Sequence, residues 1–373
     1  MLIVRSPVRI SFGGGGTDLP SYYEQFGGAV LNAAINKYFY TILGKRSDGR
    51  VQIISSDLRV FESWQHLSHL EVKGAPLEIP LAILKEMNCD LAVDLFLASE
   101  IPPGTGLGSS ASVCVNLLKT LTTYVQQPLS KSDLAEKAYH VARHMLDKNV
   151  GKQDEYAAAF GGLNYITFDP DGRTVVEPMK LAPAVLQELQ DCLMLFFTGA
   201  AHHSWTILKE QEVSTRKGSG PAVDALHEVK SLGLQMCDAL RRENLEHFGE
   251  LLHQGWMAKR RISSKISDDR IDALYSLARA EGAVGGKITG AGGGGFLLLY
   301  CARSRQQDVR NAMREQGIQE MRFEFDDQGA QTIVNDPFID GDERGGSRWV
   351  FVPRGPEVRV VAGEPRNPPQ GMP

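Results

Sequence analysis

Apolar and polar side chains alternate along the first dozen residues of the chain. Val8, Ile10 and Phe12 fall on one side of this pattern and Arg9 on the other, which predicts a strand with one buried face. Consecutive glycines from Gly13 end the strand. In the first half of the chain, similar runs predict strands over residues 29–43, 51–55, 91–97 and 163–168, and a short helix over residues 21–26.

Apolar residues at three- and four-residue spacing predict helices. Ala111, Val115 and Leu118 recur in this way directly after a glycine-rich loop, where Ser109 or Ser110 is placed to cap the helix N-terminus. A second amphipathic helix is expected over residues 131–146. The second half predicts strands over residues 192–197, 296–300 and 320–325, and helices over residues 201–215, 221–241, 245–260, 268–281 and 304–315.

This order of elements, in a chain of 373 residues, predicts an α+β protein of two domains. The turn at residues 169–172 and a proline-bearing stretch after it indicate a crossover, so we place one domain at residues 1–185 and a second at residues 186–340. Residues 341–373 are rich in glycine, proline and arginine, and we expect them to form a poorly ordered tail.

Composition narrows the partners and the compartment. A net charge of −5 gives no electrostatic reason to expect nucleic acid or an anionic membrane as a partner. Arg5 ends the first apolar run too early for a signal peptide, and no run approaches the roughly 18 apolar residues that span a bilayer, so we expect a cytoplasmic protein. The five cysteines lie far apart without a C-x-x-C pair, which favours reduced core thiols over disulfides or a zinc site.

A glycine-rich loop at residues 103–110 carries the clearest sign of chemistry. Its glycines let the backbone approach an anion, and the helix that follows offers unpaired N–H groups and the positive end of its dipole. The loop therefore predicts a phosphate cradle, although it has neither the Walker pattern nor a dinucleotide fingerprint. The alternative is a tight loop with capping serines.

Two more glycine-rich segments support the phosphate interpretation. Gly13 to Gly16 are followed by Thr17 and Asp18, and four glycines at residues 292–295 precede an apolar strand. Ordering several successive glycines is entropically costly, so each loop must serve a defined backbone role.

The three segments together resemble the GHMP kinases, named after galactokinase, homoserine kinase, mevalonate kinase and phosphomevalonate kinase. The resemblance covers about residues 1–335 and rests on the motifs PPGTGLGSSA and KITGAGGGGF, in this order. It implies an N-terminal domain like the second domain of ribosomal protein S5 and a C-terminal ferredoxin-like α/β sandwich. The segments RSPVRISFGGGGTDLP and GKQDEYAAAFGGL look most like heptose 7-phosphate kinases.

The resemblance implies an activity and a role for each motif. Heptose 7-phosphate kinases transfer the γ-phosphoryl group of ATP, with Mg²⁺, to the anomeric hydroxyl of D-glycero-D-manno-heptose 7-phosphate, for nucleotide-activated heptose in bacterial surface polysaccharide. Asp154 matches the catalytic base and Arg9 the basic residue that steadies the reacting groups. The residues matched to ATP are Pro103, Gly104, Thr105, Gly106, Leu107, Gly108, Ser109 and Ser110, with Ser110 near the metal. Those assigned to the substrate are Asp18, Gly15, Gly16, Thr17, Lys152, Gly292 and Gly293.

Physical chemistry supports these roles independently of the resemblance. Phosphoryl transfer needs positioning, charge neutralisation and an acceptor for the hydroxyl proton, and the loop, Mg²⁺, Arg9 and Asp154 supply them. Other interpretations stay open: Asp154 is also placed to stabilise a helix N-terminus, and Arg9 to lie on the surface of an edge strand.

The sequence departs from the family pattern at two places. Ala142, before Arg143, stands where many relatives have a glutamate that helps to hold Mg²⁺, so we expect Ser110, water and the nucleotide, or another carboxylate, to hold the metal. His202 and His203 stand near the position of a usual arginine, and adjacent histidines on a helix do not readily share one metal ion. The remaining candidates for the substrate phosphate are Lys152, Lys209, Arg260 and Arg261.

Two alternatives to the heptose 7-phosphate kinase assignment stay open at this point. One is the same reaction on another sugar, such as fucose, galactose or an amino sugar. The other is a catalytically weak sensor of nucleotide and sugar, for which Ala142 is the only support. The sequence leaves open whether the protein forms a homo-oligomer.

Overall fold

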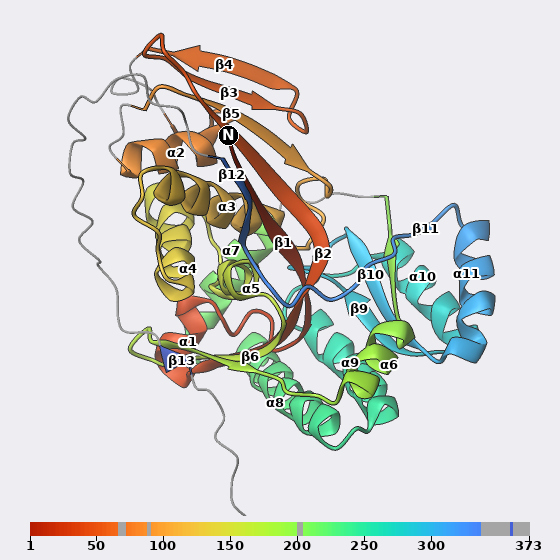
Figure 1. Ribbon diagram of the computed structural model, residues 1–373. Helices are drawn as coiled ribbons and strands as arrows, with labels where there is room; N and C mark the ends of the chain where they lie inside the picture. Colours follow the sequence, from red (N-terminus) through yellow and green to blue (C-terminus); the bar gives the residue numbers. More distant parts are fainter. Residues whose placement is uncertain (66–71, 88–90, 200–203, 337–358, 361–373) are drawn as a thin grey trace, which may run out of the picture.

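The computed structural model describes residues 1–65, 72–87, 91–199, 204–336 and 359–360. Its mixture of helices and sheets confirms the α+β prediction (Figure 1). The first half contains β1 (Leu2–Gly13), α1 (Pro20–Phe26), β2 (Gly28–Lys45), β3 (Val51–Ser55), β4 (Val60–Trp64), α2 (Glu78–Glu86), β5 (Val93–Ser99), α3 (Ser109–Tyr124), α4 (Lys131–His140), α5 (Gln153–Phe160), β6 (Leu163–Phe168) and β7 (Thr174–Pro178). The second half contains α6 (Pro183–Cys192), β8 (Leu193–Phe197), α7 (Ser204–Thr215), α8 (Pro221–Arg241), α9 (Leu245–Arg260), α10 (Asp269–Ala280), β9 (Ala283–Ile288), β10 (Phe296–Cys301), α11 (Gln306–Glu315), β11 (Gln319–Glu320), β12 (Gln331–Asn335) and β13 (Arg359–Val360).

The long strands β1 and β2 form the centre of the larger sheet. They pair antiparallel along most of their length, and the other edge of β2 pairs first with β6 and then with β5. Strand β12 pairs with the outer edge of β1, so the sheet takes a strand from beyond residue 186 (Figure 1). The end of β1 and the start of β2 lie nearest the smaller sheet, so the segment that joins these two strands lies between the sheets.

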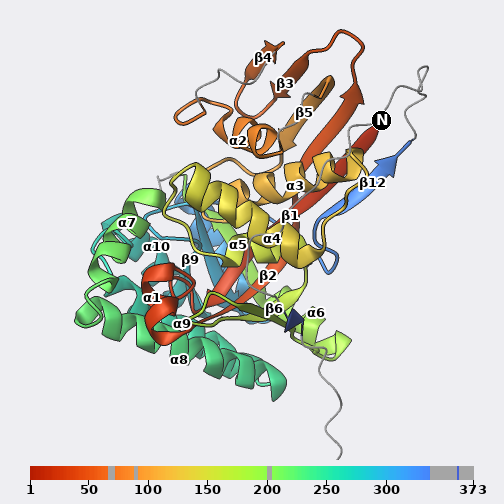
Figure 2. The ribbon, with the colours of Figure 1, turned by 90° about the vertical axis from the view of Figure 1, so that its left-hand side faces the viewer.

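Strand β1 contributes to two hydrophobic cores. Leu2 and Val4 pack with residues of α2, α3 and α4, which lie together on one face of the larger sheet (Figure 2). Val8, Ile10 and Phe12 pack instead with α8, α9 and the smaller sheet. A register shift between Pro7 and Val8 separates the two groups. Burial alternates only at the start of the strand, over residues 2–5; over residues 6–13 every residue is buried, so Arg9 is buried too, on the side opposite Val8 and Ile10.

The smaller sheet has the strand order β11-β8-β10-β9 and is antiparallel throughout. Numbered along the chain, this is the order 4-1-3-2, with helices between the first and second strands and between the third and fourth. That arrangement is the expected ferredoxin-like sandwich.

Several short elements were not predicted from the sequence. One of them is α2, which has Pro80 in its first turn, where proline costs no hydrogen bond. The predicted helix over residues 131–146 is α4 followed by one π-helical turn, Val141–Met145. The other elements that the patterns missed are β4, β7, α6, β9 and β12, and of the predicted strand at residues 320–325 only β11 forms.

Four cysteines lie in the described residues, and all four are buried free thiols: Cys114, Cys192, Cys237 and Cys301. Cys89, the pair His202 and His203, and most of residues 341–373 lie outside the described residues. Within the expected tail, β13 pairs parallel with β7. None of the helices in the described part of the chain is long and apolar enough to cross a membrane.

Candidate active site

The glycine-rich loop before α3 forms one wall of a cavity of about 350 Å³. The helix starts at Ser109, and its N-cap is Gly108, in a left-handed conformation with φ of 77°. The serines were expected to cap the helix; that prediction is wrong, because they occupy its first turn and line the cavity instead. A β-carbon at Gly108 would lie 3.1 Å from Oδ2 of Asp154, so glycine there lets α5 approach the loop.

The late glycine-rich segment packs directly against this loop. A β-carbon at Gly106 would lie 2.6 Å from the carbonyl oxygen of Thr289, which leaves no room for a side chain. Gly290 and Ala291 line the cavity. Gly292 and Gly293, the expected substrate residues, lie against Ile266 instead, and the Gly293 N–H donates to the Ile266 carbonyl at 2.8 Å. The residues of this segment that line the cavity are therefore Gly290 and Ala291, two positions before the predicted pair.

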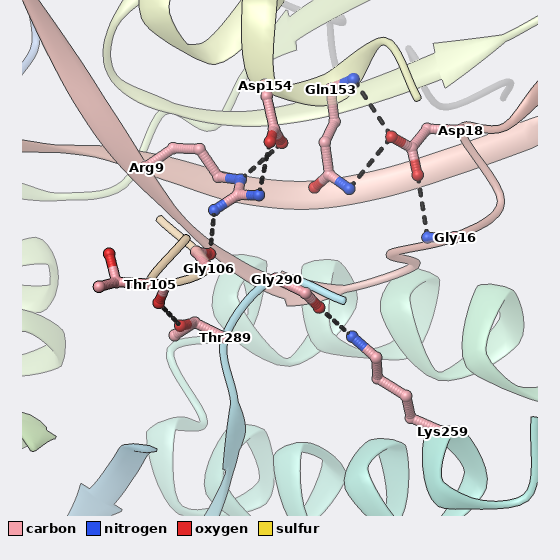
Figure 3. A network of polar contacts seen from close by, with 10 residues as sticks. All are labelled: Arg9, Gly16, Asp18, Thr105, Gly106, Gln153, Asp154, Lys259, Thr289 and Gly290. Carbon is pink, nitrogen blue, oxygen red and sulfur yellow. Dashed lines mark hydrogen bonds and ion pairs between the residues drawn. The ribbon is translucent and has the colours of Figure 1, made fainter. Parts of the chain in front are cut away.

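Arg9 and Asp154 form a two-pronged ion pair inside the cavity (Figure 3). Nε of Arg9 donates to Oδ1 of Asp154 at 2.7 Å, and Nη2 donates to Oδ2 at 2.8 Å. Nη1 donates to the Gly106 carbonyl at 2.7 Å. The guanidinium group thus ties the first turn of α5 to the phosphate loop and fixes the plane of the carboxylate. Two lone-pair positions of Asp154 stay available to accept from a hydroxyl.

Asp18 is held at the other end of the cavity. Its Oδ1 accepts from the Gly16 N–H at 2.9 Å, and its Oδ2 accepts from the side-chain amide of Gln153 at 3.1 Å (Figure 3). Burial, and after it the charge of Asp154, raises the pKa of this carboxyl. Gly15 and Gly16 also line the cavity, but Thr17 is buried, and its hydroxyl donates to the carbonyl oxygens of Gly14 in the loop and Ala29 in β2.

Lys259 is a candidate site residue that the sequence did not single out. It extends from α9 into the cavity, where Nζ donates to the Gly290 carbonyl (Figure 3). Burial, and after it the charge of Arg9, lowers the pKa of this ammonium group to about 8.

The other predicted cations lie outside the cavity. Lys152 is buried, and its Nζ lies 2.8 Å from Glu136 and 2.9 Å from the Gly172 carbonyl, so its charge is already paired inside the protein and it does not line the cavity. Arg260 pairs with Asp272, Arg261 pairs with Glu228, and Lys209 is exposed on α7. Of the loop residues assigned to ATP, Thr105 and Leu107 are buried behind the cavity wall.

Glu155 differs from Asp154 and Asp18 in having a carboxyl oxygen, Oε2, without a hydrogen-bond partner among the described residues. It is 2% exposed and lines the same cavity. Burial, followed by the charge of Asp154, raises its pKa well above the ordinary range of a glutamate. Ser110 and Ala142 are part of the same lining. A search of the described residues finds no group of three or more His, Cys, Asp or Glu side chains that could hold a metal ion.

These features suit a particular kind of chemistry. The open loop and the N-terminus of α3 offer N–H groups to an anion, Asp154 offers a fixed proton acceptor, and Arg9 and Lys259 offer positive charge within the same cavity. A hydroxyl placed against Asp154 would face any phosphate held by the loop. The arrangement is that of an in-line phosphoryl transfer site.

Comparisons with known proteins agree with this geometry. Residues 77–162 match the family model for the GHMP kinase N-terminal domain, and residues 236–319 match the model for the C-terminal domain. A D-glycero-alpha-D-manno-heptose 7-phosphate kinase from Campylobacter jejuni is 30% identical over 333 residues, which cover 88% of this chain and 97% of that protein.

Two further relatives extend the comparison. A solved structure described as a D-glycero-D-manno-heptose 1-phosphate kinase from Bacteroides thetaiotaomicron superposes with a TM-score of 0.75 and 27% identity, covering 90% of this chain and 100% of that one. An L-fucokinase/L-fucose-1-P guanylyltransferase from Bacteroides fragilis is 27% identical over 347 residues, which cover 82% of this chain and 35% of that protein.

Proposed function

The chain belongs to the GHMP kinases and is an ATP-dependent sugar kinase, and we propose that it phosphorylates the anomeric hydroxyl of D-glycero-D-manno-heptose 7-phosphate. The observation that carries the proposal is the Asp154 carboxylate, fixed by Arg9 opposite the phosphate loop. Similarity to the Campylobacter kinase over nearly the whole of that protein supports the choice of substrate.

The reaction assigned to this site is a single displacement. The anomeric oxygen attacks the γ-phosphorus of ATP while the bond to the β,γ-bridging oxygen breaks, and ADP leaves. Asp154 accepts the hydroxyl proton, and Arg9 holds the carboxylate in the orientation for that transfer. Backbone N–H groups at the start of α3 bind the phosphate oxygens.

The residues present also fit Mg²⁺, the usual companion of ATP in this family. When bound, the metal would neutralise charge on the β- and γ-phosphates. Ser110 lines the cavity beside the phosphate loop and offers a hydroxyl oxygen, and the buried, unpartnered Oε2 of Glu155 offers a second hard ligand.

Lys259 is the candidate contact for a negatively charged substrate. The cations that line the cavity in the described part of the chain are Arg9, Lys148 and Lys259. Arg9 is paired with Asp154 and Lys148 with Glu78, whereas Lys259 meets only a backbone carbonyl. A charge-assisted contact with phosphate contributes roughly 1.5–3 kcal/mol, so a phosphorylated sugar should react with about tenfold or greater kcat/KM than the free sugar.

The names of the relatives differ in the position of the substrate phosphate, 7 in one and 1 in the other, and a third relative is named for fucose. Release of ADP should therefore be measured with heptose 7-phosphate, heptose 1-phosphate, free heptose, fucose and galactose. We expect the 7-phosphate to give the highest kcat/KM and ³¹P NMR to place the new phosphate on the anomeric carbon. A product phosphorylated elsewhere, or equal efficiency with free heptose, would contradict the proposal.

A further inference from the structure

Glu155 is a buried carboxylate that the assignments of base, cradle and substrate contact leave unused. It follows Asp154 in the first turn of α5, is 2% exposed, and lines the cavity. No described residue donates a hydrogen bond to its Oε2. A buried polar atom without a partner is uncommon in a folded protein and calls for a ligand or another explanation.

The surroundings of Glu155 place it on the side of the cavity that faces α3. The pKa of the Cys114 thiol is raised by burial, and the charge of Glu155 adds to the shift. Cys114 lies four residues after Ser110, so the two side chains occupy one face of the helix. Glu155, Ser110 and Ala142 all belong to the lining of this one cavity.

Hard divalent cations take oxygen ligands, and Mg²⁺ bound with a nucleotide commonly uses only one or two from the protein. Glu155 and Ser110 supply such a pair. From this we propose that Glu155 is the carboxylate of this chain that binds the divalent cation accompanying ATP, in place of a side chain at position 142, where alanine has no ligating atom. The proposal rests on the proposed kinase function for its nucleotide, and not on the identity of the sugar.

Glu78 provides a matched control. It is the other glutamate in the cavity lining, but its carboxylate already has a partner, Lys148 Nζ at 2.8 Å. Glu78→Gln and Glu155→Gln therefore each remove one carboxyl group from the same cavity lining, with the size of the side chain kept. Only the second removes the unpartnered carboxylate.

The test measures binding of Mn²⁺ and needs no sugar. Mn²⁺ is titrated by electron paramagnetic resonance into the full-length protein saturated with a non-hydrolysable ATP analogue. We expect Glu155→Gln to weaken Mn²⁺ binding on the order of tenfold or more, and Glu78→Gln to change it less than about twofold. Equal weakening by both variants would mean that the cavity responds to net charge alone, which would overturn the proposal.

Thermal unfolding in EDTA supplies a second readout. A carboxylate kept for a cation is unfavourable when the cation is removed, so Glu155→Gln should not lower the unfolding temperature in EDTA. In the wild type, Mn²⁺ with the analogue should raise the unfolding temperature, and Glu155→Gln should reduce this increase. A lower unfolding temperature together with unchanged Mn²⁺ affinity would show a structural role and overturn the proposal. Failure of the sugar assays would leave both measurements interpretable, because they contain only protein, cation and nucleotide analogue.

Discussion

Two carboxylates at the start of α5 are adjacent in sequence but have opposite environments. Asp154 faces the phosphate loop with both oxygens bound by Arg9, and its side chain is 27% exposed. Glu155 faces α3, is almost fully buried, and has an oxygen without a partner. Neighbouring residues on a helix point about 100° apart, so a single turn presents one charge that is compensated within the chain and one that is not.

The difference indicates which parts of the site are complete before ligands bind. The Arg9–Asp154 pair is preorganised, since its partners come from β1 and α5, two elements fixed by the cores on either side. The Glu155 side is unbalanced, because burial raises the pKa of this carboxyl and one of its oxygens has no partner among the described residues. A cation that arrives with the nucleotide would restore the balance there, so the two sides should respond differently to loss of charge.

The largest expected effect is that of Asp154→Asn. Asparagine keeps an acceptor for Arg9 but loses the basic oxygen, so kcat should fall on the order of 10²- to 10⁴-fold while binding of an ATP analogue persists. Raising free Mg²⁺ should not recover the lost rate. Steady-state ADP release over a range of Mg²⁺ concentrations, with calorimetry for the analogue, measures both quantities, and near-wild-type turnover would remove Asp154 from the mechanism.

Lys259→Met removes a cation that lines the same cavity as Asp154. Burial lowers the pKa of Lys259 in the folded protein to about 8, below the ordinary 10.5, so the unfolded chain binds more protons between these values. Below about pH 8 the buried ammonium group is charged and lowers the free energy of unfolding by its full amount. This cost disappears as pH rises toward 10.5. The free energy of unfolding of the ligand-free wild type should therefore increase by up to about 3 kcal/mol across this window relative to the variant.

Denaturant unfolding at several pH values between 7.5 and 10.5 measures this difference. Lys287 is also buried, and its pKa is shifted in the same direction, which is why the comparison uses the variant and not the wild type alone. Parallel curves for the two proteins would mean that Lys259 keeps an ordinary pKa, and its assignment as a desolvated substrate contact would then be contradicted.

Much of the fold could be predicted from the sequence because long elements carry strong periodicity. The 3.6-residue pattern predicted α8 and α9 at their observed bounds, and alternation predicted that Val8, Ile10 and Phe12 lie on one side of β1. Short edge strands such as β12 have five residues and little alternation, so their pairing depends on a partner far along the chain. The place of a strand in a sheet is a tertiary property, which local pattern does not encode.

The site was predictable to the extent that its chemistry is written in motifs. Gly104, Gly106 and Gly108 were identified because a glycine-rich loop before a helix is typical of a phosphate cradle, whereas Asp154 was assigned through the resemblance to the GHMP kinases. Lys152 was assigned to the substrate, and Lys259 was missed, for a common reason: the sequence lists cations without their partners. Only the structure shows that Lys152 is already paired with Glu136. Likewise, only the structure shows that Lys259, from the second half of the chain, reaches the cavity.

The smallest expected effect, and the one that bears most directly on the unbalanced side, is that of Ala142→Glu. Ala142 lines the cavity with Glu155 and Ser110, so a glutamate there would add a carboxylate to the same lining. We expect the Mg²⁺ concentration for half-maximal rate to fall by tenfold or less, with KM for the sugar nearly unchanged. Because the new carboxylate would stand in for Glu155, the Ala142→Glu change should also restore much of the Mg²⁺ response in a Glu155→Gln background. Rate against free Mg²⁺ in the single and double variants measures both effects. If neither background responds, position 142 does not lie beside the metal. The nucleotide and Ser110 would then hold the metal without a carboxylate from this position.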